Sequence, residues 1–177
     1  MSALSSIQHS DIRKAIGNHC LTDITLAIND AAAATIKSTG SIAFVIDGRH
    51  YTKSALSDQA ITITHDCFGQ AVGGNNLPKY TQPVLTTAYY LVCLNAAGTV
   101  AVVQGSYSGQ ELRYPDLHRV LTGTGGLPVE PDGYTAIGMF KVVLTGAATF
   151  NPATTALDAS NVAVTYYDLE RVPSVAP

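Results

Sequence analysis

The sequence predicts an all-β protein, either an antiparallel β-sandwich or a jelly-roll-like domain with a short N-terminal helix and arm. Short runs of β-branched and aromatic residues recur from about residue 40 onward, and turn residues separate them. No alternation of strands with helices, the pattern of a parallel sheet, interrupts these runs. At 177 residues the chain has the length of one domain. We divide it into a helix and arm at 1–35 and a β domain at 36–177, with a long loop at about 105–135.

The N-terminal segment carries the clearest helical pattern. Ser10 provides a helix start, Ile12 and Ile16 lie at near-helical spacing, and Gly17 provides a stop. The pattern predicts one short amphipathic helix.

The residues that follow the helix, up to about Thr35, have two readings. Leu21, Ile24 and Ile28 would continue a helix, whereas Ile24, Leu26 and Ile28 alternate as in a strand. We expect an extended arm here.

Strand signals begin with a hairpin. Asp47-Gly48 lies between β-rich flanks, and this pair favours a two-residue type I′ turn because both central residues need positive φ. In "AITITHDCF", Ile61 and Ile63 alternate with threonines, which predicts a half-buried strand. The Gly-, Asn- and Pro-rich "GQAVGGNNLPKYTQP" then predicts a loop.

The most apolar part of the chain is "AYYLVCLNAAGTVAVVQ". It predicts two strands joined by a four-residue loop, in which Gly98 takes the left-handed conformation. An uncharged run on both sides of the turn indicates that both strand faces are covered, by the same domain or by a neighbouring subunit.

A long connection at about 105–135 follows this hairpin. Pro115 to Leu121 has the length of one or two helical turns, and the Gly- and Pro-rich remainder is loop. Loops of this length are often functional, so we expect a contact surface here. Strand signals return at "AIGMFKVVLTG" and "VAVTYYDLERV".

Composition excludes several classes of function. Hydrophobic residues make up 46% of the chain and charged residues only 13%, about half the usual share of about 25%. Such a chain is expected to bury surface against copies of itself. The net charge of -3 and the scattered Lys and Arg residues disfavour nucleic acid as a partner. No apolar run reaches membrane-spanning length, and no secretion signal is recognised, so the protein is expected to be made and kept in the cytosol of the cell that produces it.

No catalytic, cofactor or metal site is predicted. His65 and Cys67 have one-face spacing on a strand but lack the second ligand pair of a zinc site. The three cysteines show no repeated spacing, so reduced thiols are expected. Glu130 and Asp132 flank a proline in turn-forming sequence, and "GTGGLP" lacks the lysine of a phosphate-binding loop.

Paired tyrosines stand in two of the predicted strands, at Tyr89-Tyr90 and Tyr166-Tyr167. Since strand side chains alternate, one ring of each pair is expected to point outward. Outward rings suit a subunit interface better than a sugar site, because no polar cluster accompanies them.

Three stretches in this order resemble the head decoration (cement) and head-fibre proteins of tailed bacteriophages: "GSIAFVIDGRHYTKSA", "TTAYYLVCLNAAGTVAVVQG" and "LPVEPDGYTAIGMFKVVLTGAATFNPATTALDASNVAVTYYDL". The resemblance covers about residues 40–170 and is strongest from Ile137 to Leu169. It implies a non-enzymatic, β-rich virion protein, a homotrimer that binds the major capsid protein on the outside of the head and holds capsomers together. The stretch "YSGQELRYPDLHRVLTGTGG" departs from the pattern by its length.

The expected partners are therefore the chain itself and the major capsid protein, with no nucleic acid, membrane or cofactor. We expect the helix and the long loop to supply the contacts, through Ile12, Ile16, Tyr107, Leu112, Tyr114 and Leu117. The alternative is a receptor- or glycan-binding module of a head or tail fibre, which would use outward tyrosines and the same loop. A virion-associated hydrolase has no motif in its favour.

Overall fold

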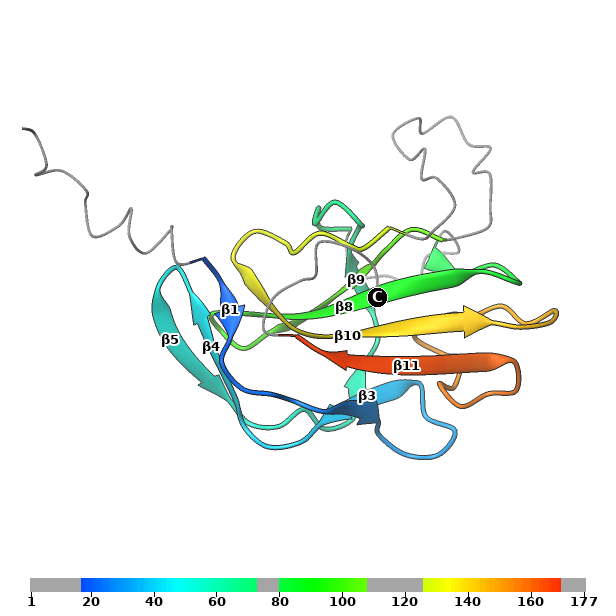
Figure 1. The fold of residues 1–177 in the computed structure, drawn as a ribbon, viewed down its shortest axis with the longest axis horizontal. Helices are drawn as coiled ribbons and strands as arrows, with labels where there is room; N and C mark the ends of the chain where they lie inside the picture. Colours follow the sequence, from blue (N-terminus) through cyan, green and yellow to red (C-terminus); the bar gives the residue numbers. More distant parts are fainter. Residues whose placement is uncertain (1–16, 73–79, 108–125, 170–177) are drawn as a thin grey trace, which may run out of the picture.

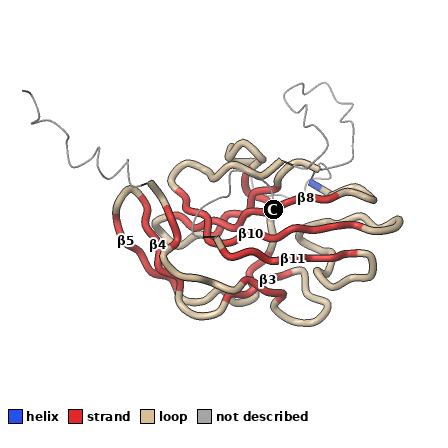
Figure 2. The backbone as a smooth tube through the Cα atoms, in the orientation of Figure 1, coloured by secondary structure: helices blue, strands red, loops and turns tan. Residues whose placement is uncertain are grey.

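The structure is a computed structural model that describes residues 17–72, 80–107 and 126–169 (Figure 1). These residues form strands and loops, with no α-helix among them (Figure 2). Eleven strands follow in chain order: β1 (His19–Cys20), β2 (Leu26–Ile28), β3 (Thr35–Ser38), β4 (Ile42–Ile46), β5 (Arg49–Lys53), β6 (Gln59–Ala60), β7 (Ile63–His65), β8 (Thr87–Asn95), β9 (Val100–Gln104), β10 (Tyr134–Leu144) and β11 (Val162–Asp168).

The strands form three sheets. The large sheet has five strands in the order β11-β10-β8-β9-β7, and two smaller sheets have the orders β1-β4-β5 and β2-β3-β6. All pairs are antiparallel except β7 with β9, which run parallel. The predicted all-β sandwich is confirmed, and the parallel pair makes the large sheet mixed rather than purely antiparallel.

The main core lies between the large sheet and the two small ones. Phe44 of β4 and Ile36 of β3 meet Tyr90 of β8 and Phe140 of β10, and all four are nearly or fully removed from solvent. The rings of Tyr90 and Phe140 stack with their centroids 4.9 Å apart. Aromatic pairs of this geometry contribute about 0.5–1.5 kcal/mol beyond the area that they bury.

A second apolar cluster lies on the opposite face of the large sheet. Leu91 and Cys93 of β8, Val103 of β9 and Met139 of β10 are all fully buried there. Half-buried residues of the same chain pack against them: Leu127, Tyr134, Tyr167 and Leu169. The prediction that both faces of the apolar hairpin are covered is confirmed, and residues of the same chain contribute to the cover.

Local sequence sets the two predicted turns. Asp47 and Gly48 have φ of 50° and 69°, as a type I′ turn between β4 and β5 requires. Gly98 has φ of 75° in the loop between β8 and β9. The side chain of Asn95 closes that loop by accepting hydrogen bonds from the N–H groups of Ala97 at 3.0 Å and Thr99 at 2.9 Å.

The segment predicted as one strand around Ile61 and Ile63 is divided between two sheets. Both isoleucines are buried and the intervening Thr62 is half-buried, as the alternation predicted. However, β6 pairs with β3 in a small sheet, and β7 pairs with β9 in the large sheet. The chain crosses from a small sheet to the large one here. The alternation of buried and less buried side chains continues through the crossing, so the sequence pattern does not reveal it.

The expected N-terminal arm packs in the core where the structure describes it. Ile24 is fully buried, and β1 and β2 pair with β4 and β3 respectively. Of the two readings of this segment, the strand is therefore the one observed at Leu26–Ile28. The predicted helix lies in 1–16, outside the described residues.

Leu26 also fits into a gap that Gly138 leaves in β10. The pairing of β10 with β8 shifts register between Ala136 and Gly138, a β-bulge with Ile137 as the extra residue. A Cβ atom on Gly138 would overlap Cδ1 of Leu26. The glycine thus permits β2 to cross close over the large sheet.

A network of buried polar side chains lies within the main core. The Tyr90 hydroxyl donates to Oε1 of Gln82 at 3.0 Å and accepts from Nε2 of Gln104 at 2.8 Å. Nε2 of Gln82 donates to the carbonyls of Thr86 at 3.0 Å and Val142 at 3.1 Å. The network joins the segment before β8 to three strands of the large sheet.

Replacing Gly138 with alanine is expected to destabilise the fold by about 1–3 kcal/mol, the usual cost of an extra buried carbon in a packed core. Urea unfolding would measure it. The matched test repeats the substitution in a Leu26→Ala background, where the overlapping side chain is gone and the cost should largely disappear. An equal cost in both backgrounds would show that Leu26 is not the cause.

Replacing Tyr90 with phenylalanine is expected to lower the free energy of unfolding by about 1–3 kcal/mol, because both glutamines lose a partner while buried. The control is Tyr51→Phe: its half-buried ring stacks on Phe44, and its hydroxyl makes no hydrogen bond with the described residues. That change should stay within about 0.5 kcal/mol. A similar loss of unfolding free energy for both variants would show that the network does not stabilise the fold.

Candidate functional site

Of the residues predicted to make contacts, Tyr107 is described. Ile12 and Ile16 lie in 1–16, and Leu112, Tyr114 and Leu117 lie in 108–125, both outside the described residues. The Tyr107 ring is half-buried against the main core, and its hydroxyl donates to the carbonyl of Thr81 at 3.4 Å. Part of its role is therefore structural, since it holds the chain after β9 against the segment before β8.

An exposed apolar turn follows Thr81, and we call residues 83–86 the apolar turn. Leu85 is 70% exposed and Val84 39% exposed. Leu85 also has φ of 58°, a conformation that is rare for a large side chain and marks strain. The Thr86 hydroxyl closes the turn by donating to the carbonyl of Pro83 at 2.6 Å.

The core network fixes the base of this turn, because the fully buried Gln82 precedes it directly. Sequence reasoning missed the site. A leucine at positive φ has no local signal, and the only clue was an apolar Val-Leu pair directly after a proline in a segment otherwise typical of a loop.

A second exposed apolar pair is formed by Phe68 and Val129, which are 49% and 53% exposed. The Val129 N–H donates to the carbonyl of Cys67 at 3.0 Å, which brings the two loops together. The carboxylate of Asp66 shapes the first loop by accepting from the N–H groups of Phe68 and Gln70.

The paired tyrosines lie on opposite faces, as strand alternation predicts, but the expected outward ring at Tyr89-Tyr90 is wrong. Tyr89 is only 4% exposed in the second cluster, and Tyr90 is fully buried in the main core. Tyr166 and Tyr167 are half-buried, on the main core and the second cluster respectively. The reason is that both faces of the sheet are covered, so alternation places each ring under a layer.

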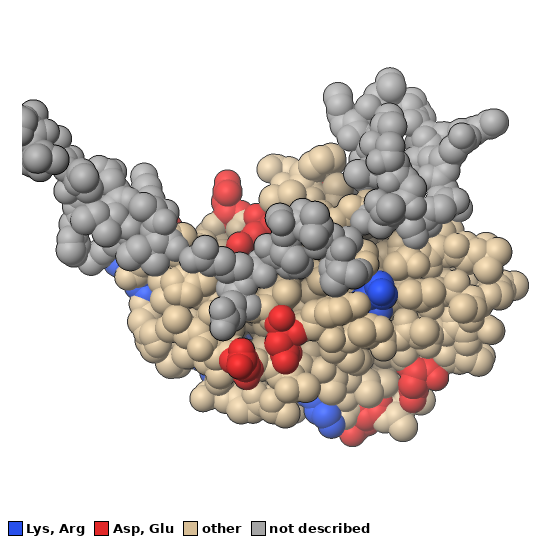
Figure 3. Space-filling model, viewed as in Figure 1, with Lys and Arg blue, Asp and Glu red and all other residues tan. Residues whose placement is uncertain are grey.

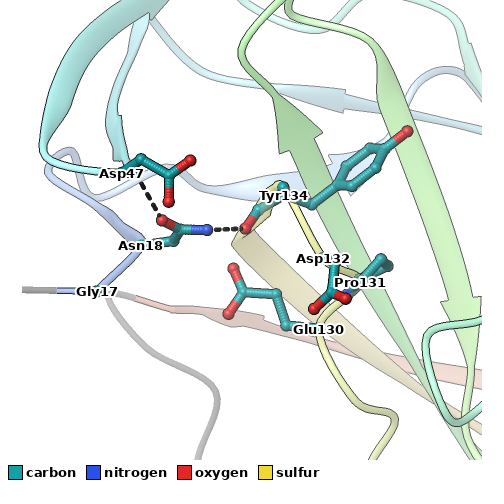
Figure 4. Close-up of a pocket in the computed structure, with 8 residues that line it drawn as sticks. Gly17, Asn18, Asp47, Glu130, Pro131, Asp132 and Tyr134 are labelled. Atoms are coloured by element: carbon teal, nitrogen blue, oxygen red, sulfur yellow. Dashed lines mark hydrogen bonds between the residues drawn. The ribbon is translucent and has the colours of Figure 1, made fainter. Parts of the chain in front are cut away.

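An open pocket of about 340 Å³ lies at one end of the sandwich (Figure 4). Its lining includes the carboxylates of Asp47, Glu130 and Asp132, and no Lys or Arg. The Asn18 amide holds the walls together: Nδ2 donates to the carbonyl of Tyr134 at 2.7 Å, and Oδ1 accepts from the Asp47 N–H at 2.9 Å (Figure 4).

Glu130 is the one pocket carboxylate with a defined structural partner. Its Oε1 accepts a hydrogen bond of 2.7 Å from the Ala136 N–H at the bulge of β10. Burial raises the pKa of the Glu130 carboxyl, and the hydrogen bond from Ala136 offsets part of that rise. The carboxylate supports the local backbone, which gives it a structural role at the pocket wall.

The cysteine side chains lie in the interior of the described structure. Cys20, Cys67 and Cys93 are all buried. Burial raises the pKa of the Cys93 thiol well above its ordinary value, and the nearby charge of Glu130 adds to the rise, so the unreactive thiol form is favoured. In the described part of the chain no three His, Cys, Asp or Glu residues group as metal ligands.

Charge is sparse on the surface as well as in the composition. On the face seen in Figure 3, single basic side chains stand far apart, a few acidic ones lie near one another, and most of the visible surface is uncharged. Within the described ranges no helix has the length and apolarity of a membrane span.

Comparison with protein-family models, with curated proteins and with solved structures yields no match in any of the three. The resemblance to phage head proteins therefore stays a prediction.

The raised pKa of Glu130 predicts how pH affects stability. The folded chain keeps this proton to higher pH than the unfolded chain, so ionisation of Glu130 opposes folding. Its contribution to the free energy of unfolding falls as pH rises from the ordinary carboxyl range through the raised pKa. Glu130→Gln retains an acceptor for the Ala136 N–H and cannot ionise, so its stability relative to the wild type should increase across that window.

Urea unfolding at a series of pH values would measure the difference. Asp132→Asn removes a carboxylate from an exposed position in the same pocket and serves as the control for a general loss of negative charge. A stability difference between Glu130→Gln and the wild type that does not change with pH would contradict the raised pKa of Glu130.

Proposed function

We propose that this chain is a non-enzymatic virion structural protein, a capsid decoration (cement) protein that binds the outer surface of a phage head as a homo-oligomer. In this role it binds the major capsid protein and stabilises the contacts between neighbouring capsomers. The sequence resemblance names the class of partner, with a trimer as the expected assembly. The location that follows is the capsid surface of the virion, after synthesis in the host cytoplasm.

The observation that carries the proposal is the apolar turn. A leucine that is 70% exposed and held at positive φ costs stability and brings the isolated domain no packing. Such strain persists when the surrounding structure fixes it, and here Gln82 and Thr86 do so. A rigid apolar projection of this kind suits a hot spot, which gains affinity by filling a pocket of a partner at little cost in side-chain ordering.

The low surface charge supports the same role. A capsid lattice presents many identical sites, so a decoration subunit needs only modest affinity at each contact when several subunits are joined. Few charged groups then have to be desolvated on binding, which keeps the cost of association low.

The alternative, a receptor- or glycan-binding module of a head or tail fibre, has one observation in its favour. The pocket of Figure 4 offers carboxylates and backbone groups to hydroxyl-rich ligands. Its Asn18 amide is already engaged on both sides by the walls, and Glu130 accepts from the Ala136 N–H, which leaves the carboxylates of Asp47 and Asp132 for a ligand. Tyr89 and Tyr90 are both buried, so they offer neither a stacking ring to a sugar nor an outward ring to a subunit interface. The apolar turn is the observation that favours the decoration role.

Replacing Leu85 with serine is expected to weaken binding of the protein to head shells by about tenfold or more, since burial of a leucine side chain contributes about 1.5–3 kcal/mol. Co-sedimentation with shells that lack the decoration protein would measure this. Leu21→Ser is the matched control, because Leu21 is 50% exposed and adjoins β1 rather than the apolar turn. Equal losses for the two variants would point to a general effect of surface polarity.

Quantitative mass spectrometry of purified particles separates the two functions. Hundreds of copies in a simple ratio to the major capsid protein would support decoration, whereas a dozen or so would favour a fibre. Saturable binding to host-surface polysaccharide that Asp47→Asn and Asp132→Asn abolish, without binding to shells, would replace the decoration proposal with the alternative.

A further inference from the structure

Strand β11 forms one edge of the large sheet, and its register fixes which backbone groups face outward. The Thr145 N–H donates to the carbonyl of Asn161 at 3.0 Å, and the two residues stand opposite each other in the register of β10 and β11. In an antiparallel pair, hydrogen-bonded residues alternate with residues that point away. Thr165, opposite Lys141, therefore bonds to β10, whereas the backbone groups of Val164 and Tyr166 face the outer edge.

These outward groups have no hydrogen-bond partner among the described residues. The first residue of the strand differs, because the Val162 N–H turns back to the carbonyl of Ala159 at 3.0 Å. Backbone N–H and C=O groups left unpaired in a folded chain are ones that water reaches, because burial without a partner costs about 1–3 kcal/mol each. Within the described residues, the outer edge of β11 is therefore not paired with any strand.

The other sheet edges in the described part of the chain are protected or short. β5 carries Arg49, His50 and Lys53, the kind of charged side chains that prevent edge pairing. β7 has three residues and is followed by a return of the chain that bridges His65 to Ala71. β11 has seven residues, no Pro or basic residue, and Asp168 as its single charge. It is the longest unprotected edge that these residues form.

We propose that β11 pairs antiparallel with β11 of a second copy, so that two five-stranded sheets become continuous across a two-fold axis at Thr165. The backbone N–H and C=O of Val164 then bond to the C=O and N–H of Tyr166 in the other copy. By symmetry, Tyr166 of the first copy bonds to Val164 of the second in the same way. The Asp168 N–H donates to the carbonyl of Val162 of the other copy. That carbonyl is available because only the N–H of Val162 is used in the turn, where it bonds to Ala159.

Side chains match in this register as well. Val164 stands opposite Tyr166 of the other copy on the main-core side, and a β-branched residue opposite an aromatic one is a favourable cross-strand pair. Thr165 stands opposite Thr165 at the axis, where the backbone of both residues bonds inward and the side chains come closest. The single charge, Asp168, stands opposite Val162 and not opposite itself, so no like charges meet.

This pairing is independent of the capsid role. It predicts a two-fold dimer in place of the trimer that the sequence resemblance implies, because a homotrimer would require a different, head-to-tail surface. Binding to shells and self-association are separate measurements, so either proposal can fail while the other stands.

The experiment places opposite charges on the axis. Thr165 is exposed, so Thr165→Lys and Thr165→Glu leave the core unchanged; the neighbouring Lys141 disfavours the first and favours the second within one copy. Light scattering after size exclusion should give a dimer for the wild type. Each variant alone should associate about tenfold or more weakly, because like charges face each other, and an equimolar mixture should recover the dimer. Thermal unfolding of each variant verifies that it is folded.

Amide hydrogen exchange provides the residue-level readout. On dilution from dimer to monomer, the amides of Val164 and Tyr166 should lose protection, while the Thr165 amide between them, bonded to β10, should keep it. Val164→Pro removes one outward N–H and leaves the ladder to β10 intact, so it should give a folded monomer. A wild type that is monomeric at high micromolar concentration, a dimer or trimer that these variants leave unchanged, or a mixture that fails to recover would overturn the proposal.

Discussion

The fold depends on strand β8, in which seven consecutive residues from Ala88 to Leu94 are buried. A strand presents alternate side chains to opposite faces, so a run of this kind requires apolar cover on both sides of the sheet. Two small sheets cover one face and create the main core. On the other face, the described residues that contribute to the cover lie in the segment 126–134 and at the end of β11. Much of the apolar composition of the described residues is used inside one chain in this way, and the exposed apolar groups among them lie in turns and loops and along one strand edge.

The polar network around Tyr90 adds specificity to this apolar interior. Hydrophobic burial is non-directional and would tolerate several positions for the segment before β8. Hydrogen bonds from the Gln82 amide to the carbonyls of Thr86 and Val142 fix one of them, because the alternatives leave buried amide groups unpaired. The apolar turn inherits that rigidity, since it begins at the residue after Gln82. The buried hydrogen-bond network thus fixes the position of the exposed Leu85 at the surface.

Features encoded within a few residues were predictable, and features that join distant segments were not. The Asp47-Gly48 turn and the loop of Gly98 follow from backbone preferences of the residues themselves. The all-β class and the two-sided burial of β8 follow from periodicity and apolarity. The division between β6 and β7 was not visible, because alternation of Ile61 and Ile63 is the same in one sheet or in two. The pocket was also hidden, since Asn18 and Tyr134, which hydrogen-bond there, are 116 positions apart. The positive φ of Leu85 arises from tertiary contacts and has no sequence signal.

The two edges of the large sheet show how the fold limits its own assembly. At the β7 edge the strand is short, and the chain returns beside it through the His65–Ala71 bridge, so growth of the sheet stops within the monomer. At the β11 edge the strand is long, uncharged over most of its length and unpaired within the described part of the chain. A sheet with one closed and one open edge adds one neighbour and no more, because pairing at β11 leaves two closed edges outside. In the proposed dimer, this asymmetry limits edge-to-edge growth of the large sheet to two copies, and so it avoids the unlimited aggregation that is the usual hazard of an apolar β protein.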